Sequence, residues 1–170
     1  MDAVNHFESQ TTYRLIRLEY LAALGVSFFL FFAHLGEINW WVFAVLFVYI
    51  DLIGYIPGAI AFHRSKDKRI SKAYYVLYNT MHSLVSQSVV ALFWVVLVRP
   101  EWALLALPIH LCGDRALFGN FLKPFSVSFE PIAHPAFSRL TREIETPKSS
   151  VAPAQSALVQ SALVDQAVSS

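Results

Sequence analysis

The sequence predicts an all-α, polytopic membrane protein with four transmembrane helices. Hydrophobic residues make up 56% of the 170 residues and charged residues 15%, whereas a soluble domain of this size carries about 25% charged residues. The apolar residues form four long blocks, each long enough to cross a hydrocarbon core of about 30 Å. The net charge of +1 gives no basic field that would favour nucleic acid, and the single cysteine, Cys112, excludes a disulfide framework or a cysteine-based zinc site.

The four blocks are interpreted as spans of one transmembrane domain, residues 15–124. They cover about residues 15–35, 40–62, 74–98 and 102–122. Residues 1–14 form a polar leader without the basic region of a cleavable signal peptide, so we expect the first helix to be a retained insertion signal. Trp40 begins the second span as part of an aromatic belt. Gly54 and Pro57 are expected to kink that span or to end it early.

The loop between the second and third spans predicts the orientation of the chain. Residues 64–72 carry five basic residues and one acidic residue. The positive-inside rule therefore places this loop, and with it both termini, on the cytoplasmic side of a bacterial inner membrane. Anionic lipid is a plausible partner of such a basic loop.

Two segments after the fourth span are predicted to leave the membrane. Residues 125–145 mix aromatic, proline and charged residues and are expected to lie along the interface. His134, within this segment, could fold back to the cytoplasmic end of the helices. Residues 146–170 are rich in Ser, Ala, Val and Gln, and their low complexity predicts a disordered tail.

Ionisable residues inside the spans are the feature that points to function. His110 and Asp114 are four residues apart, so on a helix they share one face. Asp51 and His82 lie in two other spans, and all four residues fall about 12–18 Å from the cytoplasmic ends of their helices, at 1.5 Å per residue. A charged side chain in hydrocarbon costs about 2.5–3.5 kcal/mol on insertion scales, which packing alone does not explain.

These four residues predict a metal site. Imidazole and carboxylate groups together suit Zn, Fe or Mn, so Asp51, His82, His110 and Asp114 are the expected ligands. Such a centre would make the protein a metal-dependent, hydrolase-like enzyme acting on a lipid or another apolar substrate. Glu19 could serve it as a base, and Arg115 could hold a phosphate group or pair with Glu19.

Two non-enzymatic readings remain open. In the first, the protein is a structural subunit, and the polar residues fix the register of the helices as a metal-free network. In the second, the cluster is a proton or solute path. A single chain with four spans has little room for a pore, so a transporter would need a homo-oligomer.

An ordered set of short motifs resembles a family of small bacterial four-helix membrane proteins of unknown function. The motifs are Arg17-Leu-Glu19, Trp40-Trp-Val-Phe43, Asp51-Leu-Ile-Gly-Tyr55, Tyr78-Asn-Thr-Met-His82, His110-Leu-Cys-Gly-Asp-Arg115 and Leu122-Lys123. The resemblance implies a four-helix fold and a membrane location, and it implies no activity. The sequence departs from the family at residues 118–123, where the family usually has a Gly-Tyr-Gly-Leu-Lys run.

A second, weaker resemblance concerns metal-dependent hydrolases of the bacterial inner membrane. Those enzymes combine a His-Arg pair with a nearby Thr-His-Ser motif. Here His63-Arg64 and Thr80-Met-His82-Ser83 are similar in type, although their spacing differs.

Overall fold

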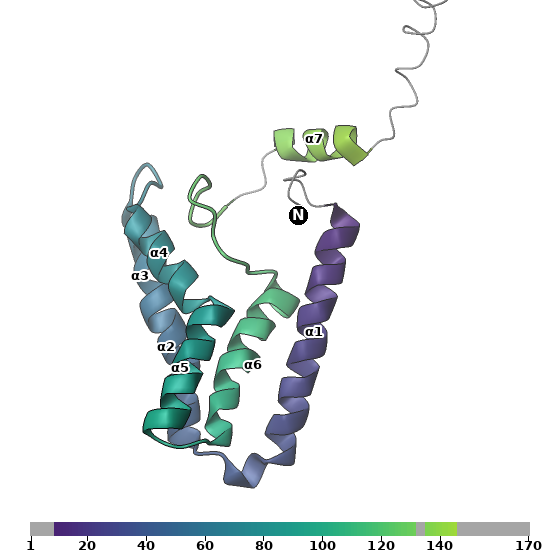
Figure 1. Cartoon of the computed structure of the whole chain (residues 1–170). Coiled ribbons are helices and arrows are strands. Elements are labelled where there is room, and N and C mark those ends of the chain that lie inside the picture. The colour runs from purple at the N-terminus through teal and green to yellow at the C-terminus, as the bar shows by residue number, and fades with distance from the viewer. Residues whose placement is uncertain (1–8, 132–134, 146–170) are drawn as a thin grey trace, which may run out of the picture. The chain divides into compact units, whose positions relative to one another are not determined.

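The computed structural model describes residues 9–131 and 135–145, which are helical with no strand (Figure 1). The chain divides into two compact units, one comprising residues 10–132 and the other residues 1–9 with 133–170. The first unit holds the predicted spans. Residues 1–8, His134 and the predicted tail, residues 146–170, lie outside the described residues.

The first predicted span is a single long helix, α1 (Gln10–Ala33). It begins within the segment predicted as a leader. A short 3-10 turn, η1 (Leu35–Glu37), leads to α2 (Trp40–Gly54). The side chain of Asn39 caps α2 because its Oδ1 accepts a hydrogen bond from the backbone N–H of Val42 at 3.3 Å.

The second span is interrupted where the sequence predicts it. α2 ends at Gly54, and α3 (Ile56–Arg64) follows after Tyr55. Pro57 lies in the first turn of α3, and it lacks the N–H that would continue the hydrogen bonds of α2 into α3. The predicted interruption near Gly54 and Pro57 is therefore confirmed.

The third span is not the continuous helix that the sequence predicts. α4 (Lys72–Met81) and α5 (Leu84–Leu97) meet at an angle of 55°. Ser83 begins α5 as its cap, since its Oγ accepts from the N–H of Ser86 at 3.5 Å. Gln87 satisfies a carbonyl group at the end of α4, because its Nε2 donates to the carbonyl of Met81 at 2.7 Å. His82 thus lies at a helix break rather than inside a helix.

The fourth segment contains three kinds of helical turn. A 3-10 turn, η2 (Trp102–Leu105), continues into α6 (Ala106–Gly113) and then into a π-helical stretch, η3 (Asp114–Phe118). The helical segment ends at Phe118 and is followed by Gly119, whose φ of 72° is left-handed. The hydroxyl of Tyr13 packs against Gly119 and leaves no room there for a side chain.

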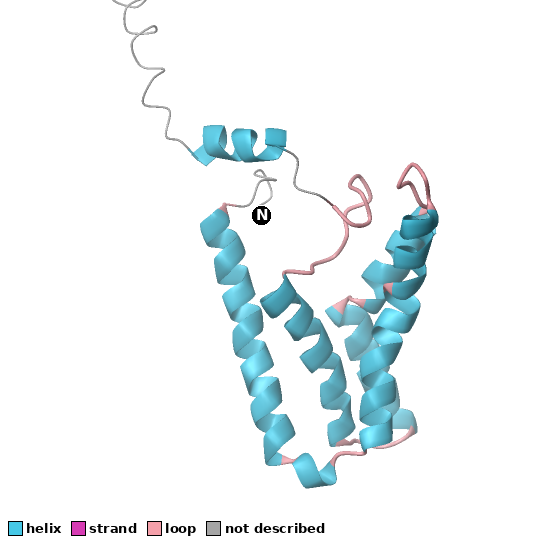
Figure 2. Cartoon of the chain, turned by 180° about the vertical axis from the view of Figure 1, so that it is seen from behind, coloured by secondary structure: helices cyan, strands magenta, loops and turns pink. Residues whose placement is uncertain are grey.

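α6 is the central helix of this unit. It packs against α1, α2 and α5 (Figures 1 and 2), and six of its eight residues are buried. Its apolar residues join two core clusters, one with α2 and one with α1. A third cluster joins Phe62, Tyr75 and Tyr78 to Phe129, which lies in the segment after η3 and is fully buried.

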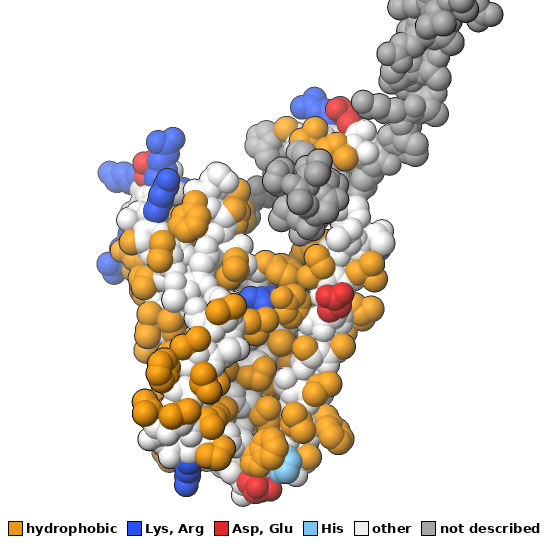
Figure 3. All heavy atoms as spheres, viewed as in Figure 1, with side chains coloured by type: hydrophobic (Ala, Val, Ile, Leu, Met, Phe, Trp, Pro, Cys, Tyr) orange, Lys and Arg blue, Asp and Glu red, His pale blue; other side chains and the backbone are white. Residues whose placement is uncertain are grey.

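The outward faces of the helices are apolar, as expected for a protein in lipid. Trp41 is 84% exposed and Phe29 is 72% exposed. Hydrophobic side chains cover much of the face in Figure 3, while basic side chains gather at the end of the α3–α4 hairpin. Among the described residues, two helical stretches are long and apolar enough to cross a membrane: α1, and α2 together with α3 over Trp40–Arg64. A third is added if α4 and α5 form one bent span. Together these features describe a helical, multi-pass membrane protein.

The second unit contains α7 (Pro135–Glu145). Phe137, Leu140 and Ile144 are exposed on this helix with a spacing of three and four residues, so they share one face. The interfacial position of residues 125–145 stays a prediction.

Candidate metal centre

Three of the predicted ligands converge from three separate segments of the chain. Asp51 comes from α2, His82 from the break between α4 and α5, and His110 from α6. One ligand atom from each of these residues lies within 4.8 Å of the other two. The side chains of both histidines are 5% exposed, whereas that of Asp51 is 42% exposed. The result is a buried His/His pair with a carboxylate on its more open side.

Each imidazole Nε2 faces two carboxylate oxygens. His82 Nε2 lies 3.2 Å from Asp51 Oδ1 and 3.4 Å from Asp114 Oδ2. His110 Nε2 lies 3.7 Å from Asp51 Oδ2 and 3.7 Å from Asp114 Oδ2. The predicted shared face of His110 and Asp114 is confirmed, although Asp114 is not part of the three-residue group.

The nitrogen–oxygen separations are close to those between two ligands of a small metal ion. Zinc binds nitrogen and oxygen ligands at about 2.0–2.2 Å, and at tetrahedral angles two such ligands lie about 3.3–3.5 Å apart. The four nitrogen–oxygen distances, between 3.2 and 3.7 Å, bracket that range. The donor set of two imidazoles and carboxylates is one that Zn, Fe and Mn accept.

The ring of His82 has a hydrogen-bond acceptor at each nitrogen, the carbonyl of Tyr78 at Nδ1 and the carboxylate of Asp51 at Nε2. Its Nδ1 lies 3.1 Å from the backbone carbonyl of Tyr78, and a carbonyl only accepts, so Nδ1 carries a proton. In neutral His82 the lone pair of Nε2 therefore faces the oxygens of Asp51 and Asp114. That repulsion is relieved either by a cation between them or by a second proton on the ring.

His110 has no hydrogen-bond partner among the described residues. Both of its ring nitrogens are buried and unsatisfied, and its ring packs edge-on against Phe47 with centroids 4.8 Å apart. An unpaired buried polar group costs about 1–3 kcal/mol. A metal ion bound at Nε2 would satisfy one of these two nitrogens.

The backbone around Gly54 allows His82 to come close to α2. A Cβ atom on Gly54 would lie 2.8 Å from Met81 Cβ and 3.1 Å from His82 Nδ1. The ring of His82 also stacks on Tyr78, with centroids 4.0 Å apart and 12° between the planes. Gly54 and Tyr78 thus position the predicted ligand His82 without contributing ligand atoms themselves.

The two residues predicted to be catalytic lie in different surroundings. The guanidinium of Arg115 is buried and donates to the carbonyl of His82 at 2.9 Å and to the hydroxyl of Tyr20 at 2.8 Å. Glu19 is exposed on α1 and forms no ion pair with Arg115 or with any other described residue. Catalytic roles for both residues stay predictions.

A cavity of about 460 Å³ reaches the cluster from the side of the carboxylates. Asp51, His82 and Asp114 lie on its wall. The remaining lining residues are Tyr55, Tyr78, Phe118, Asn120, Lys123, Glu130 and Pro131. A molecule in this cavity would therefore have direct access to the carboxylates and to His82.

Comparisons with known proteins add no assignment to this geometry. No family model, curated protein or solved structure matches this chain. Both family resemblances therefore stay predictions. His63, which carries part of the weaker one, is not in the cluster; its Nε2 pairs with Glu130 Oε2 at 3.3 Å.

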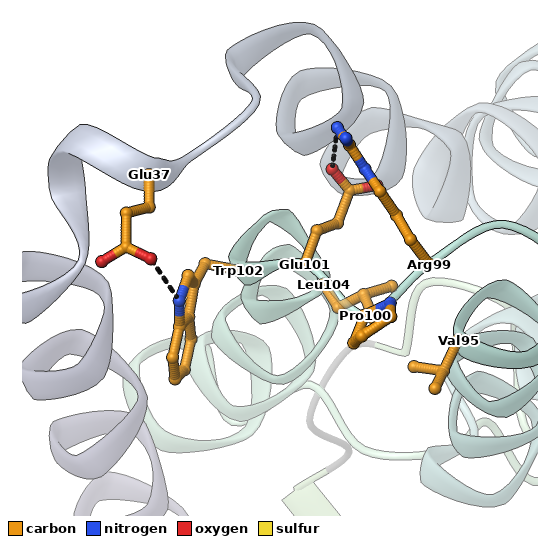
Figure 4. Close-up of a pocket in the computed structure, with 7 residues that line it drawn as sticks. All are labelled: Glu37, Val95, Arg99, Pro100, Glu101, Trp102 and Leu104. Atoms are coloured by element: carbon orange, nitrogen blue, oxygen red, sulfur yellow. Dashed lines mark hydrogen bonds and ion pairs between the residues drawn. The ribbon is translucent and has the colours of Figure 1, made fainter.

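A second cavity, of about 520 Å³, lies where α5 connects to η2 (Figure 4). Glu37 accepts a hydrogen bond there from the indole N–H of Trp102 at 3.2 Å, and Arg99 pairs with Glu101 at 3.6 Å. The ring of His34 stacks on Trp102, with centroids 3.7 Å apart. His34 is therefore packed at this boundary, apart from the metal-ligand group.

Sequence reasoning gave no site role to Lys123, Tyr78 or Glu130. Lys123 has one usable signal, since it is a lysine placed directly after an apolar block and before a proline. Glu130 reaches the cavity because the segment after η3 folds back onto α4. No local sequence pattern predicts this path of the chain.

Proposed function

We propose that this protein is a membrane-embedded, metal-dependent enzyme of the hydrolase type that acts on a lipid or another apolar substrate. The proposal includes four spans, counting the bent α4–α5 pair and the segment from η2 to η3. It also places the basic loop, the cavity and both termini toward the cytoplasm. His82, His110 and Asp51 are the proposed ligands, with Asp114 as a further ligand.

The observation that carries the proposal is the pair of imidazole nitrogens facing carboxylates. With Nδ1 of His82 donating to the carbonyl of Tyr78, the lone pair of Nε2 in the neutral ring is directed at the carboxylates and can bind a cation there. Apart from the carboxylates, the nitrogens of His110 have no partner among the described residues. A bound divalent ion would also supply a water with a pKa near 7, as in hydrolytic metal sites. The cavity beside the carboxylates gives a substrate access to that position.

The strongest competing function is a structural, metal-free network. A doubly protonated His82 between Asp51 and Asp114 would make two ion pairs, and the nearby charge of Arg115 would balance the second carboxylate. This alternative needs a proton on Nε2 of His110 as well, which would then pair with Asp51 and Asp114 at 3.7 Å. Even so, Nδ1 of His110 has no hydrogen-bond partner among the described residues.

Elemental analysis of the purified protein separates the two. We expect about one tightly held transition metal ion per chain in wild type and in His34→Ala, which alters a histidine outside the cluster. His110→Leu should lose the ion and should unfold at a lower temperature, close to that of chelator-treated wild type.

The metal-free network gives the opposite result. In that case no preparation holds a metal, even after reconstitution with Zn, Fe and Mn. Treatment with a chelator would then leave the unfolding temperature of wild type unchanged, because no ion contributes to the folded state.

A further inference from the structure

The cavity beside the cluster has a second charged group, the ammonium of Lys123. Lys123 shares the cavity wall with Asp51, His82 and Asp114. The ammonium lies over the rings of Phe129 and Tyr78, with Nζ at 4.5 Å and 4.7 Å from the two centroids. A positive charge is thus held at one place on the wall, with carboxylates and imidazole at another.

The backbone of Lys123 is fixed by a reciprocal pair of hydrogen bonds. Asn79 Oδ1 accepts from the N–H of Lys123 at 2.7 Å, and Asn79 Nδ2 donates to its carbonyl at 2.9 Å. The side chain is anchored as well, because Nζ donates to the carbonyl of Phe129 at 2.6 Å. Lys123 is therefore preorganised, unlike the exposed lysines of the basic loop.

The charge of Lys123 forms no direct ion pair among the described residues, although the carboxylates of Glu130 and Asp114 attract it from farther away. Within residues 9–131 and 135–145 no acidic oxygen lies within ion-pair distance of its Nζ, and the carbonyl of Phe129 uses one of its three donors. Glu130, the nearest acidic neighbour in sequence, is occupied by the hydroxyl of Tyr55 and by His63. Burial lowers the pKa of Lys123, which is the effect expected of an ammonium with too few partners.

A bound metal makes the cavity attractive to anions. With neutral His82, a divalent ion would cancel the charges of Asp51 and Asp114, and Lys123 would offset Glu130 on the wall. Arg115 does not line the cavity and would add a positive charge behind His82. Lys binds phosphate as a point charge, while the metal coordinates phosphoryl oxygens directly. The cavity wall also includes Phe118, which is 73% exposed and offers an apolar surface for the rest of a ligand.

We propose that the cavity takes a phosphate monoester group, held between Lys123 and the metal centre, as the anionic head of an apolar substrate. This inference rests on the proposed function and names its substrate class. It assigns Lys123 to binding of the phosphoryl group. The same chemistry is present in a phosphatidate head group and in a free phosphate, so the test compares both.

The test measures binding to the full-length, metal-reconstituted protein in detergent. Titrations use dihexanoyl phosphatidate, inorganic phosphate and uncharged dihexanoylglycerol. We expect phosphatidate to bind at least tenfold more tightly than dihexanoylglycerol. Lys123→Met should weaken phosphatidate binding at least tenfold, Lys123→Arg should stay within about threefold of wild type, and Lys66→Met, with the same loss of charge in the exposed loop, should bind as wild type does.

A measurement on the unaltered protein covers the case in which Lys123→Met does not fold. Acetylation of wild type followed by mass spectrometry should show protection of Lys123 by phosphatidate and no protection of Lys66. Protection by phosphatidate alone identifies a lipid head group as the source, while equal protection by inorganic phosphate identifies a free phosphate site. Unprotected Lys123, or equal binding of phosphatidate and dihexanoylglycerol, would overturn the inference.

Metal content measured on the same samples distinguishes this inference from the proposed function. If wild type and Lys123→Met each hold one metal ion and bind phosphatidate equally well, the metal centre is supported and the substrate assignment is overturned. If wild type holds no metal but binds phosphate, and Lys123→Met does not bind phosphate, the metal centre is overturned and the anion site is supported.

Discussion

The position of His82 is determined by several single residues around its ring. Tyr78 stacks on the ring and accepts from Nδ1, Arg115 holds the carbonyl, and Gly54 leaves the space that the ring enters. None of these three contributes an atom to the proposed metal site. They act as outer partners that orient a ligand, and loss of such a partner typically costs about 10–100-fold in metal affinity.

Gly54→Ala tests this positioning. The added methyl group would come within 3.2 Å of His82 Cε1 and closer still to Met81. We expect the free energy of unfolding to fall by about 1–3 kcal/mol, which is typical of overpacking. We also expect metal affinity to fall by about tenfold or more. Chemical denaturation in detergent and metal competition with a chelator measure the two effects.

Gly25→Ala is the matched control, because a Cβ atom there meets nothing within 4 Å. It replaces a glycine by the best helix former within α1 and should leave metal affinity unchanged. Equal metal affinity in Gly54→Ala and Gly25→Ala would show that the position of His82 does not depend on Gly54.

At the level of elements, the break between α4 and α5 places His82 at the cluster. A helix break inside a membrane leaves carbonyl groups without partners, and each must be satisfied within the protein. Gln87 serves the carbonyl of Met81 and also accepts from the hydroxyl of Tyr49 on α2. This one side chain therefore closes the break and ties α5 to α2.

Gln87→Leu should be destabilising although it replaces a polar residue by an apolar one of similar size in a membrane protein. The carbonyl of Met81 and the hydroxyl of Tyr49 would both lose a partner, at a cost of about 1–3 kcal/mol for each buried group. Thermal unfolding in detergent should show this loss. The control is Ser88→Ala, on an exposed position of the same helix, which should change stability by less than about 0.5 kcal/mol. If Gln87→Leu is as stable as this control, Gln87 does not have the proposed role.

The sequence predicts some breaks in these helices and not others, for physical reasons. The interruption after Gly54 is predictable because Pro57 lacks an N–H, which is a local property. The break at His82 contains neither Gly nor Pro, and its polar residues resemble a polar helix face until Gln87 and Arg115 are placed in three dimensions. The convergence of Asp51, His82 and His110 was predictable from their similar depths, whereas the partners of Arg115 depend on packing between distant segments.

For the whole molecule, topology is the feature that unites the predictions. The proposed four spans place the turn at Gly36 outside the cell and the loop at Lys66 in the cytoplasm. Both residues are exposed, and nothing lies within 4 Å of a Cβ atom on Gly36. The native cysteine, Cys112, is buried and can be replaced by Ala for labelling.

Cysteine labelling of cells tests the topology. In a Cys112→Ala background, Gly36→Cys should react with a membrane-impermeant maleimide in intact spheroplasts. Lys66→Cys should react only after the membrane is permeabilised. The reverse pattern would show an inverted protein, and reaction of both from one side would show that the segment from α2 to α3 does not cross the membrane.

The hydrogen bond from Arg115 to the carbonyl of His82 also has a consequence for the order of biosynthesis. The two residues are 33 positions apart, and ribosomes make the acceptor first. When the third helical segment has been made, the carbonyl of His82 at its broken turn still lacks the donor that Arg115 supplies. The nascent chain is therefore incomplete at this point until the last helical segment has been translated, and that same segment delivers His110 and Asp114. The carbonyl of His82 gains its donor and the cluster gains its last residues at the same late stage, when the segment that contains α6 and η3 is made.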